Sequence, residues 1–229
     1  MIPTIDGKMH HFVNAGLYDA LFVMQDTETK TLWNHITGEA LYGELVGRGL
    51  PISNLLQVDV RQALNMDPDV HVAISDRPVL GRMRGVGPGG PNAQLMPMFI
   101  ETLGVEDTRR PRMDMGLGVW SEQTRKYYPV ETLRERGKAV IDTIDGKNVL
   151  VYLDALTSTP AAVFVEATEA RFDGQEIFLD NDRLLRSGVL VGADGQPLPR
   201  EQPQQIFTRW YGFALTFPDP EIYGETREP

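Results

Sequence analysis

Asp26, Glu28, His35 and Glu39 are the residues whose types and spacing best suit chemistry. Carboxylates and an imidazole gathered around a hairpin can bind a divalent metal ion or act as an acid and base pair. Trp33 lies among them and can form the wall of a pocket. The alternative interpretation is structural: Asp26 fixes a turn, Glu28 and His35 are solvated, and Glu39 caps a glycine bend. The sequence leaves both interpretations open.

If the functional interpretation holds, the metal ligands are expected to be Asp26, His35 and Glu39. His10 and His11 are adjacent, so in a strand they point to opposite faces and cannot both bind one metal directly. We therefore interpret these two histidines as an exposed pair near the start of the chain.

The stretch 85–90 satisfies the G-x-G-x-x-G pattern of dinucleotide-binding loops. That pattern functions only where a strand precedes it and a helix opens at its end. Pro88 and Pro91 prevent such a helix start. The backbone amides of this stretch, together with Arg82 and Arg84, instead indicate a loop that binds an anion or a partner.

The composition limits the classes of partner. The chain has 229 residues, 41% of them hydrophobic, which is enough for a core. A net charge of −10 argues against binding to nucleic acid, and no apolar run is long enough for membrane insertion. The absence of cysteine excludes disulfides and thiolate metal sites. We expect a soluble acidic protein that is cytoplasmic, or exported with its leader removed.

The pattern of strands and turns predicts a β-rich α+β fold, with hairpins that form an antiparallel or mixed sheet and two or three short helices. Asp145-Gly146 is a strong signal for a two-residue hairpin turn, and Asp59 is suited to cap a short helix. Aromatic residues predict a helix from Ile206 to Phe217. The other main expected elements are strands over 9–14, 19–25, 31–33, 54–57, 70–74, 116–121, 125–128, 139–142, 148–152, 162–167 and 176–179, and helices over 60–65 and 130–136.

Three regions differ in character along the chain. Residues 1–76 form a first β-rich part, and 77–115 are a connector rich in Pro, Gly and Arg. Residues 116–229 form a second β-rich part that carries the aromatic helix. We expect these regions to make one compact domain.

Two blocks of motifs resemble the bacterial and archaeal family DUF3179, a domain of unknown function. The first block comprises Gly16-Leu17, Val23 to Thr29, and Leu32 to Ala40 with Gly43 and Gly47; the second comprises Gly118-Val119, Tyr128-Pro129-Val130, Ile144 to Lys147 and Val149 to Tyr152. Typical members carry these blocks in the opposite order. The family's Tyr-Cys-Pro-Leu-Cys-Gly motif is replaced here by residues 152–157, without cysteine. The resemblance thus implies a shared scaffold and excludes a role that depends on those cysteines.

These observations favour a non-catalytic binding or assembly module that acts with a protein partner or as a homo-oligomer. The candidate binding residues are Asp26, Trp33, His35, Glu39, Arg82 and Arg84. No cofactor is expected in this interpretation. The alternative is a metal-dependent or acid/base enzyme, centred on Asp26, His35 and Glu39, in which a divalent metal would be the cofactor.

Overall fold

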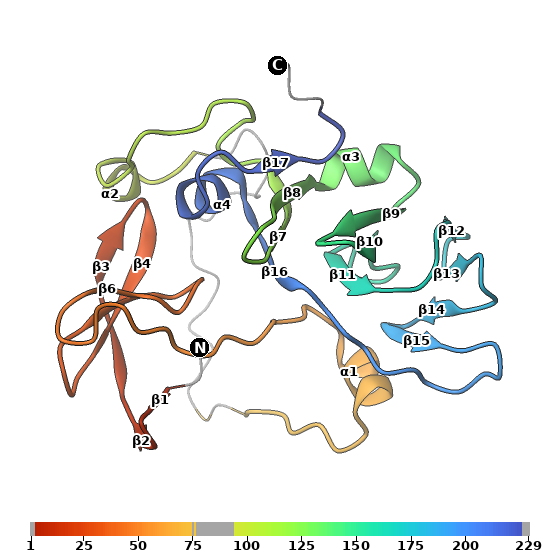
Figure 1. Cartoon of the computed structure of the whole chain (residues 1–229), viewed down its shortest axis with the longest axis horizontal. Helices are drawn as coiled ribbons and strands as arrows, with labels where there is room; N and C mark the ends of the chain where they lie inside the picture. The colour runs from red at the N-terminus through yellow and green to blue at the C-terminus, as the bar shows by residue number, and fades with distance from the viewer. Residues whose placement is uncertain (1–2, 75, 77–93, 226–229) are drawn as a thin grey trace. The chain divides into compact units, whose positions relative to one another are not determined.

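The computed structural model describes residues 3–74, 76 and 94–225 (Figure 1). Arg82, Arg84 and the glycine-rich stretch 85–90 lie outside the described residues. The chain forms two compact units, which are described separately. The first unit combines Met1–Leu55, Gln94–Asp114 and Thr208–Pro220, and the second combines Leu56–Ala93, Met115–Phe207 and Glu221–Pro229.

The first unit is built on a four-stranded antiparallel sheet in which each strand pairs with the next in the sequence. Its strands are β3 (Phe12–Tyr18), β4 (Leu21–Asp26), β5 (Leu32–Asn34) and β6 (Ala40–Tyr42). A separate two-stranded sheet and two short helices complete the unit: β1 (Thr4–Ile5), β2 (Lys8–Met9), α2 (Pro97–Ile100) and α4 (Trp210–Thr216).

The predicted hairpin about Asp26 is present, between β4 and β5. The backbone N–H of Asp26 donates to the carbonyl of Thr31, and the N–H of Lys30 donates to the carbonyl of Asp26. The Asp26 carboxylate accepts from the backbone and the hydroxyl of Thr29, and the Thr29 hydroxyl contacts that of Thr31 at 2.7 Å. A short polar side chain thus fixes the turn, as turn chemistry predicts.

Trp33 forms the centre of the core of this unit. It is completely buried and packs with Ile5 and Leu50, and Phe12 meets its ring edge-on at 6.2 Å. The burial of the tryptophan against β1 and the segment after β6 joins the large sheet to the rest of the unit.

The described residues of the second unit form three sheets. A three-stranded antiparallel sheet has the order β11-β10-β9, a four-stranded antiparallel sheet has the order β12-β13-β14-β15, and a mixed sheet has the order β16-β7-β8-β17. The elements are α1 (Val60–Met66), β7 (Met115–Trp120), β8 (Arg125–Pro129), α3 (Val130–Glu135), β9 (Ala139–Ile144), β10 (Lys147–Leu153), β11 (Pro160–Phe164), β12 (Ala170–Phe172), β13 (Glu176–Leu179), β14 (Leu184–Arg186), β15 (Val189–Val191), β16 (Gln204–Arg209) and β17 (Glu221–Ile222).

The strand β10 contributes to two hydrophobic clusters because alternate residues of a strand face opposite sides of the sheet. Val149 and Val151 belong to the cluster that includes Leu133 of α3, whereas Leu150 and Tyr152 belong to the cluster formed with β13 to β15. The uninterrupted apolar run of β10 is therefore buried on both faces.

The turn between β10 and β11 repeats the turn about Asp26. The N–H of Asp154 donates to the carbonyl of Thr159, and the N–H of Ser158 donates to the carbonyl of Asp154. The Asp154 carboxylate accepts from the backbone and the hydroxyl of Thr157, whose hydroxyl contacts that of Thr159 at 2.7 Å. The shared pattern Asp-x-x-Thr-x-Thr therefore gives the same turn once in each unit.

The predicted helix from Ile206 to Phe217 is wrong over its first four residues. Residues Gln204–Arg209 form β16, in line with the β-favouring Ile206 and Phe207, and the helix begins only at Trp210. The backbone N–H groups of Trp210 and Tyr211 donate to carbonyls in the 112–114 segment, which satisfies donors that a helix start leaves free.

The strands predicted over 54–57 and 70–74 do not form. Both segments are described, and neither contains a strand. The side chains of Leu55 and Ile74 are 90% and 87% exposed. An alternating apolar pattern needs a neighbouring strand to become a sheet, and here neither segment has one.

The predicted β-rich fold is confirmed, with a mixed sheet and four short helices in the described residues rather than two or three. The capped helix after Asp59 and the Asp145-Gly146 hairpin are both present. Within residues 3–74, 76 and 94–225, no helix has the length and apolar character required to cross a membrane.

Candidate functional site

Asp26 is a heavily hydrogen-bonded carboxylate of the first unit. It ends β4, is completely buried, and accepts from Nε1 of Trp33 at 2.9 Å. It also accepts from the backbone N–H of Thr29 at 2.6 Å and from the Thr29 hydroxyl. Nδ1 of His10 lies 3.3 Å from its Oδ1 atom.

These donors outweigh the effect of burial on the Asp26 carboxyl. Burial by itself raises the pKa, but the hydrogen bonds from Trp33, Thr29 and His10 lower it, and the resulting pKa is about 2. Asp26 is thus ionised near neutral pH and carries a buried negative charge.

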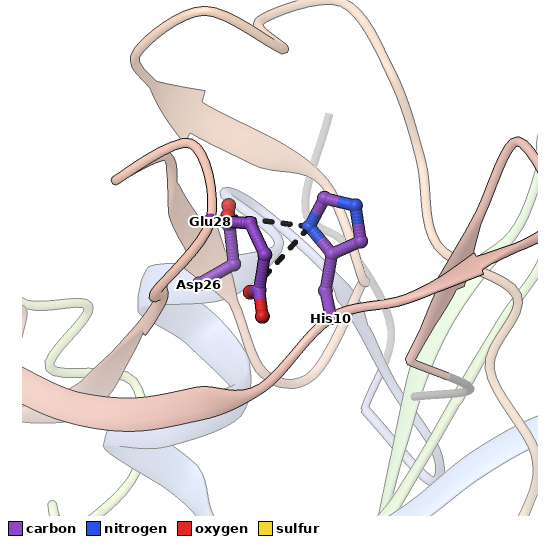
Figure 2. A group of neighbouring side chains, drawn as sticks. All are labelled: His10, Asp26 and Glu28. Atoms are coloured by element: carbon purple, nitrogen blue, oxygen red, sulfur yellow. Dashed lines mark hydrogen bonds and ion pairs between the residues drawn. The ribbon is translucent and has the colours of Figure 1, made fainter.

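His10 and Glu28 lie beside Asp26 (Figure 2). One possible ligand atom from each of the three residues lies within 4.8 Å of the other two. Among the residues that the structure describes, this is the one group of three or more such side chains that could hold a metal ion. His11 binds Glu28 at 2.8 Å, and its side-chain and backbone hydrogen bonds lower the pKa of Glu28 to about 2. The expectation that His10 and His11 form an exposed pair is wrong for His10, which is only 8% exposed.

The geometry of this group favours a structural role. A carboxylate has about four acceptor positions, and four donor groups from His10, Thr29 and Trp33 already point at Asp26. A metal ion would have to displace at least one of them. Asp26 therefore acts as the fixed acceptor at the centre of the turn.

His35 and Glu39 lie outside the three-residue group around Asp26. Nδ1 of His35 is 2.7 Å from the carbonyl oxygen of Phe22, and the exposed Glu39 accepts from the hydroxyl of Thr37 at 3.2 Å. The structure therefore brings Asp26 together with His10 and Glu28, and not with the two other residues that the sequence suggested as ligands.

The arginines at the end of the connector are already paired with acids. Arg109 binds Asp107, and Arg112 binds Glu106 at 2.5 Å. Arg110 binds Asp114 at 2.5 Å. A hollow of about 430 Å³ over residues 106–112 thus contains cations whose charge is compensated.

A different cavity, of about 310 Å³, lies in the second unit. Four segments distant in sequence surround it: helix α1, the turn after β10, the turn after β12 and the turn after β14. Its lining consists of Arg61, Gln62, Tyr152, Asp154, Ala155, Leu156, Phe172, Gly174, Gln175, Ile177, Leu185, Ser187 and Gly188. It includes Tyr152, Asp154, Ala155 and Leu156 of the 152–157 segment, which by the resemblance stands where the family motif has its two cysteines.

Gln62 positions α1 at this cavity. Its backbone N–H donates to Oδ1 of Asp59 at 2.7 Å, and its side-chain oxygen accepts from the Asp59 N–H, which is a reciprocal capping box. Its amide nitrogen then donates to Oδ2 of Asp154 at 2.6 Å. Gln62 is completely buried and Asp154 is partly buried, so a hydrogen bond that is partly shielded from solvent holds the helix to the turn.

The turns about Asp26 and Asp154 differ in the N–H group that donates to the Oδ2 atom of the aspartate. In the first unit, Trp33 provides it to Asp26. The residue at the same offset from Asp154 is Ala161, which has no side-chain donor. The amide of Gln62 supplies the missing hydrogen bond to Asp154.

Tyr152 places a buried hydroxyl group at the cavity. The residue is 2% exposed, and its oxygen accepts from Nη2 of Arg200 at 3.0 Å. Burial raises the pKa of Tyr152, the positive charge of Arg200 opposes that rise, and Asp154 adds to it. The hydroxyl is therefore neutral, and its own proton is bound to no acceptor among the described residues.

Sequence reasoning missed Arg61, Gln62, Tyr152 and Arg200. The Asp59-x-x-Gln62 spacing is the signature of a capping box and could have identified Gln62 as a structural residue. Nothing in the local sequence marks Arg200, because it reaches Tyr152 only across 48 positions of the chain.

The comparisons with known proteins give one result. The sequence model of a protein family described as "Protein of unknown function (DUF3179)" matches residues 3–212. The matched range includes both blocks of motifs, 16–47 and 118–152, and the cavity residues. No curated protein and no solved structure matches the chain.

Proposed function

Because this chain belongs to the DUF3179 family, whose description names no activity, we propose its function from its geometry: it is a non-catalytic binding module, and its ligand site is the cavity of the second unit. The observation that carries this proposal is the buried Tyr152 hydroxyl at a cavity of about 310 Å³. Ligand pockets are concave, mainly apolar, and contain a few polar groups that orient the ligand.

The lining of the cavity fits that description. Phe172, Ile177 and Leu185 offer apolar surface, and Tyr152 and Gln62 are the buried polar residues beside them. Gln62 and Asp154 satisfy each other, whereas the Tyr152 hydroxyl retains a proton that is able to orient a ligand. The volume lies at the lower end of the range for small-molecule sites, about 300–1,000 Å³.

Ligand mapping on the full ¹⁵N-labelled chain tests this proposal. A mixture of small neutral and charged aromatic compounds is expected to shift the amide signals of residues 154–156 and 174–188, which include much of the lining. Shifts spread over both units, or shifts confined to the first unit, would contradict the assignment of the cavity as the binding site.

The alternative function is a metal-dependent or acid/base enzyme centred on Asp26, with His35 and Glu39 or with His10 and Glu28. The grouping of His10, Asp26 and Glu28 supports this alternative. The four donors around Asp26 weigh against it. Elemental analysis of untagged protein separates the two functions, because the metal enzyme requires a near-stoichiometric divalent metal and the binding module requires none.

An assembly role with a protein partner or a second copy of the chain is a further proposal. It is supported by exposed apolar side chains on the sheet of the first unit, among them Tyr18 and Tyr42, at 64% and 73% exposure. Light scattering on the purified chain tests it, and a monomer at every accessible concentration would argue against self-association.

A further inference from the structure

The charges around the cavity of the second unit differ in how well they are compensated. Asp154 is the acid in the lining, and four donor groups compensate it: the Gln62 amide, the backbone N–H groups of Leu156 and Thr157, and the Thr157 hydroxyl. Hydrogen bonds of this number stabilise a carboxylate without a counter-cation. The Asp154 carboxylate is thus hydrogen-bonded on both of its oxygens.

The cations have no such compensation. Among the described residues, Arg200 donates only to neutral oxygens, the carbonyl of Gly188 at 2.8 Å and the hydroxyl of Tyr152 at 3.0 Å. Its Nε atom is buried and has no hydrogen-bond partner in the described structure. Arg61 lines the cavity from α1 and forms no ion pair with any described residue.

Tyr152 connects this positive charge to the cavity. Its oxygen accepts from Arg200, so its own proton is free to donate to a group inside the cavity. A cation that donates to a hydroxyl polarises it, which strengthens the hydrogen bond that the hydroxyl then donates. An anion beside the Tyr152 hydroxyl would therefore accept a hydrogen bond from it. That hydrogen bond would be strengthened by the positive charge of Arg200.

From these observations we propose that the cavity binds a small organic anion, a carboxylate or a phosphate ester on an apolar body. The Tyr152 hydroxyl donates to the anionic group, Arg61 pairs with it, and Phe172, Ile177 and Leu185 contact the apolar body. This inference rests on the proposed function, since it assigns the chemistry of the ligand to the same cavity.

Three probes with one aromatic ring test the charge requirement: benzoate, phenyl phosphate and benzyl alcohol. Binding to the full chain is measured by calorimetry and by the shifts of the cavity amides in NMR spectra. At least one of the two anions is expected to bind about tenfold more tightly than the alcohol, the difference typical of one charge-assisted hydrogen bond. The anion that binds more tightly identifies the preferred charged group.

Arg61→Gln tests the residue that pairs with the anion. It is expected to weaken binding of the preferred anion about tenfold and to leave benzyl alcohol binding unchanged. Arg125→Gln is the matched control, because Arg125 is an exposed arginine of the same unit, outside the cavity lining, and its loss changes the net charge equally. Tyr152→Phe is expected to reduce the same preference, with the unfolding transition recorded to confirm that the variant is folded.

The possible outcomes distinguish a failure of the anion preference from a failure of the binding site itself. If benzyl alcohol binds in the cavity as tightly as both anions, or if Arg61→Gln and Arg125→Gln have equal effects, the anion inference is wrong and the binding site remains. If no probe shifts the cavity amides at millimolar concentration, the proposed site fails together with the inference.

Discussion

Nε1 of Trp33 donates a hydrogen bond to Oδ2 of Asp26 at 2.9 Å, and both residues are completely buried. The indole thus fills the core of the first unit with its rings and neutralises part of a buried charge with its N–H group. These two contributions can be separated by substitution, because phenylalanine retains most of the volume and none of the hydrogen bonding.

Trp33→Ala is expected to reduce the free energy of unfolding by about 3–5 kcal/mol, and Trp33→Phe by about 1–3 kcal/mol through the lost donor. Urea unfolding measures both values. Tyr42→Ala is the control, because Tyr42 belongs to the same sheet and is 73% exposed, so its loss should change stability by less than about 0.5 kcal/mol. A Trp33→Phe variant as stable as the natural chain would show that the hydrogen bond to Asp26 contributes nothing.

The lowered pKa of Asp26 predicts that the free energy of unfolding depends on pH. Its pKa is about 2 in the folded chain and 3.8 in an ordinary carboxyl, so the unfolded chain binds the proton more readily. The stabilisation is therefore complete above about pH 4 and is lost as the pH falls towards 2, a change of about 2 kcal/mol. Urea unfolding between pH 5 and pH 2 should show this loss.

Asp26→Asn provides the comparison for the acid dependence. The variant should be less stable at neutral pH, because an amide cannot accept from all the donors that face the carboxylate. It should also lose less stability on acidification than the natural chain. The same slope in both proteins would mean that other carboxylates, such as Glu28, account for the acid sensitivity.

Gly38 is expected to tolerate substitution less well than Gly47. Both have a positive φ angle, +76° and +89°, which costs an L residue about 1–2 kcal/mol. A Cβ atom on Gly38 would lie 2.5 Å from the carbonyl oxygen of Leu50, whereas a Cβ on Gly47 would meet nothing within 4 Å. Gly38→Ala should therefore cost about 1–3 kcal/mol more than Gly47→Ala in urea unfolding. Equal costs would show that the backbone near Leu50 moves freely.

Gln62 should be important for the stability of the second unit. Gln62→Leu retains the volume but removes the donor to Asp154 and the acceptor for the Asp59 N–H, at a cost of about 1–3 kcal/mol. Leu64→Gln on the same helix is the control, because Leu64 is 48% exposed. A cost for Gln62→Leu no larger than for the control would contradict the role of this hydrogen bond.

The sequence alone determined the features that depend on neighbouring residues. The Asp26 turn, the Asp145-Gly146 hairpin and the helix capped by Asp59 were all predictable, because each is stabilised by groups within a few positions of one another. The burial of Trp33 was predictable as well, since a large apolar side chain after a hairpin has to be removed from water.

The tertiary structure decided which residues meet across long stretches of chain. Gln62 reaches Asp154 across 92 positions, and Arg200 reaches Tyr152 across 48. Nothing in the local pattern distinguishes these side chains from other polar residues, because their partners are defined by the packing of α1 and of the strands around β10. For the same reason His10 could be recognised as a buried partner of Asp26, and Glu39 as an exposed residue apart from it, only once the sheets had formed.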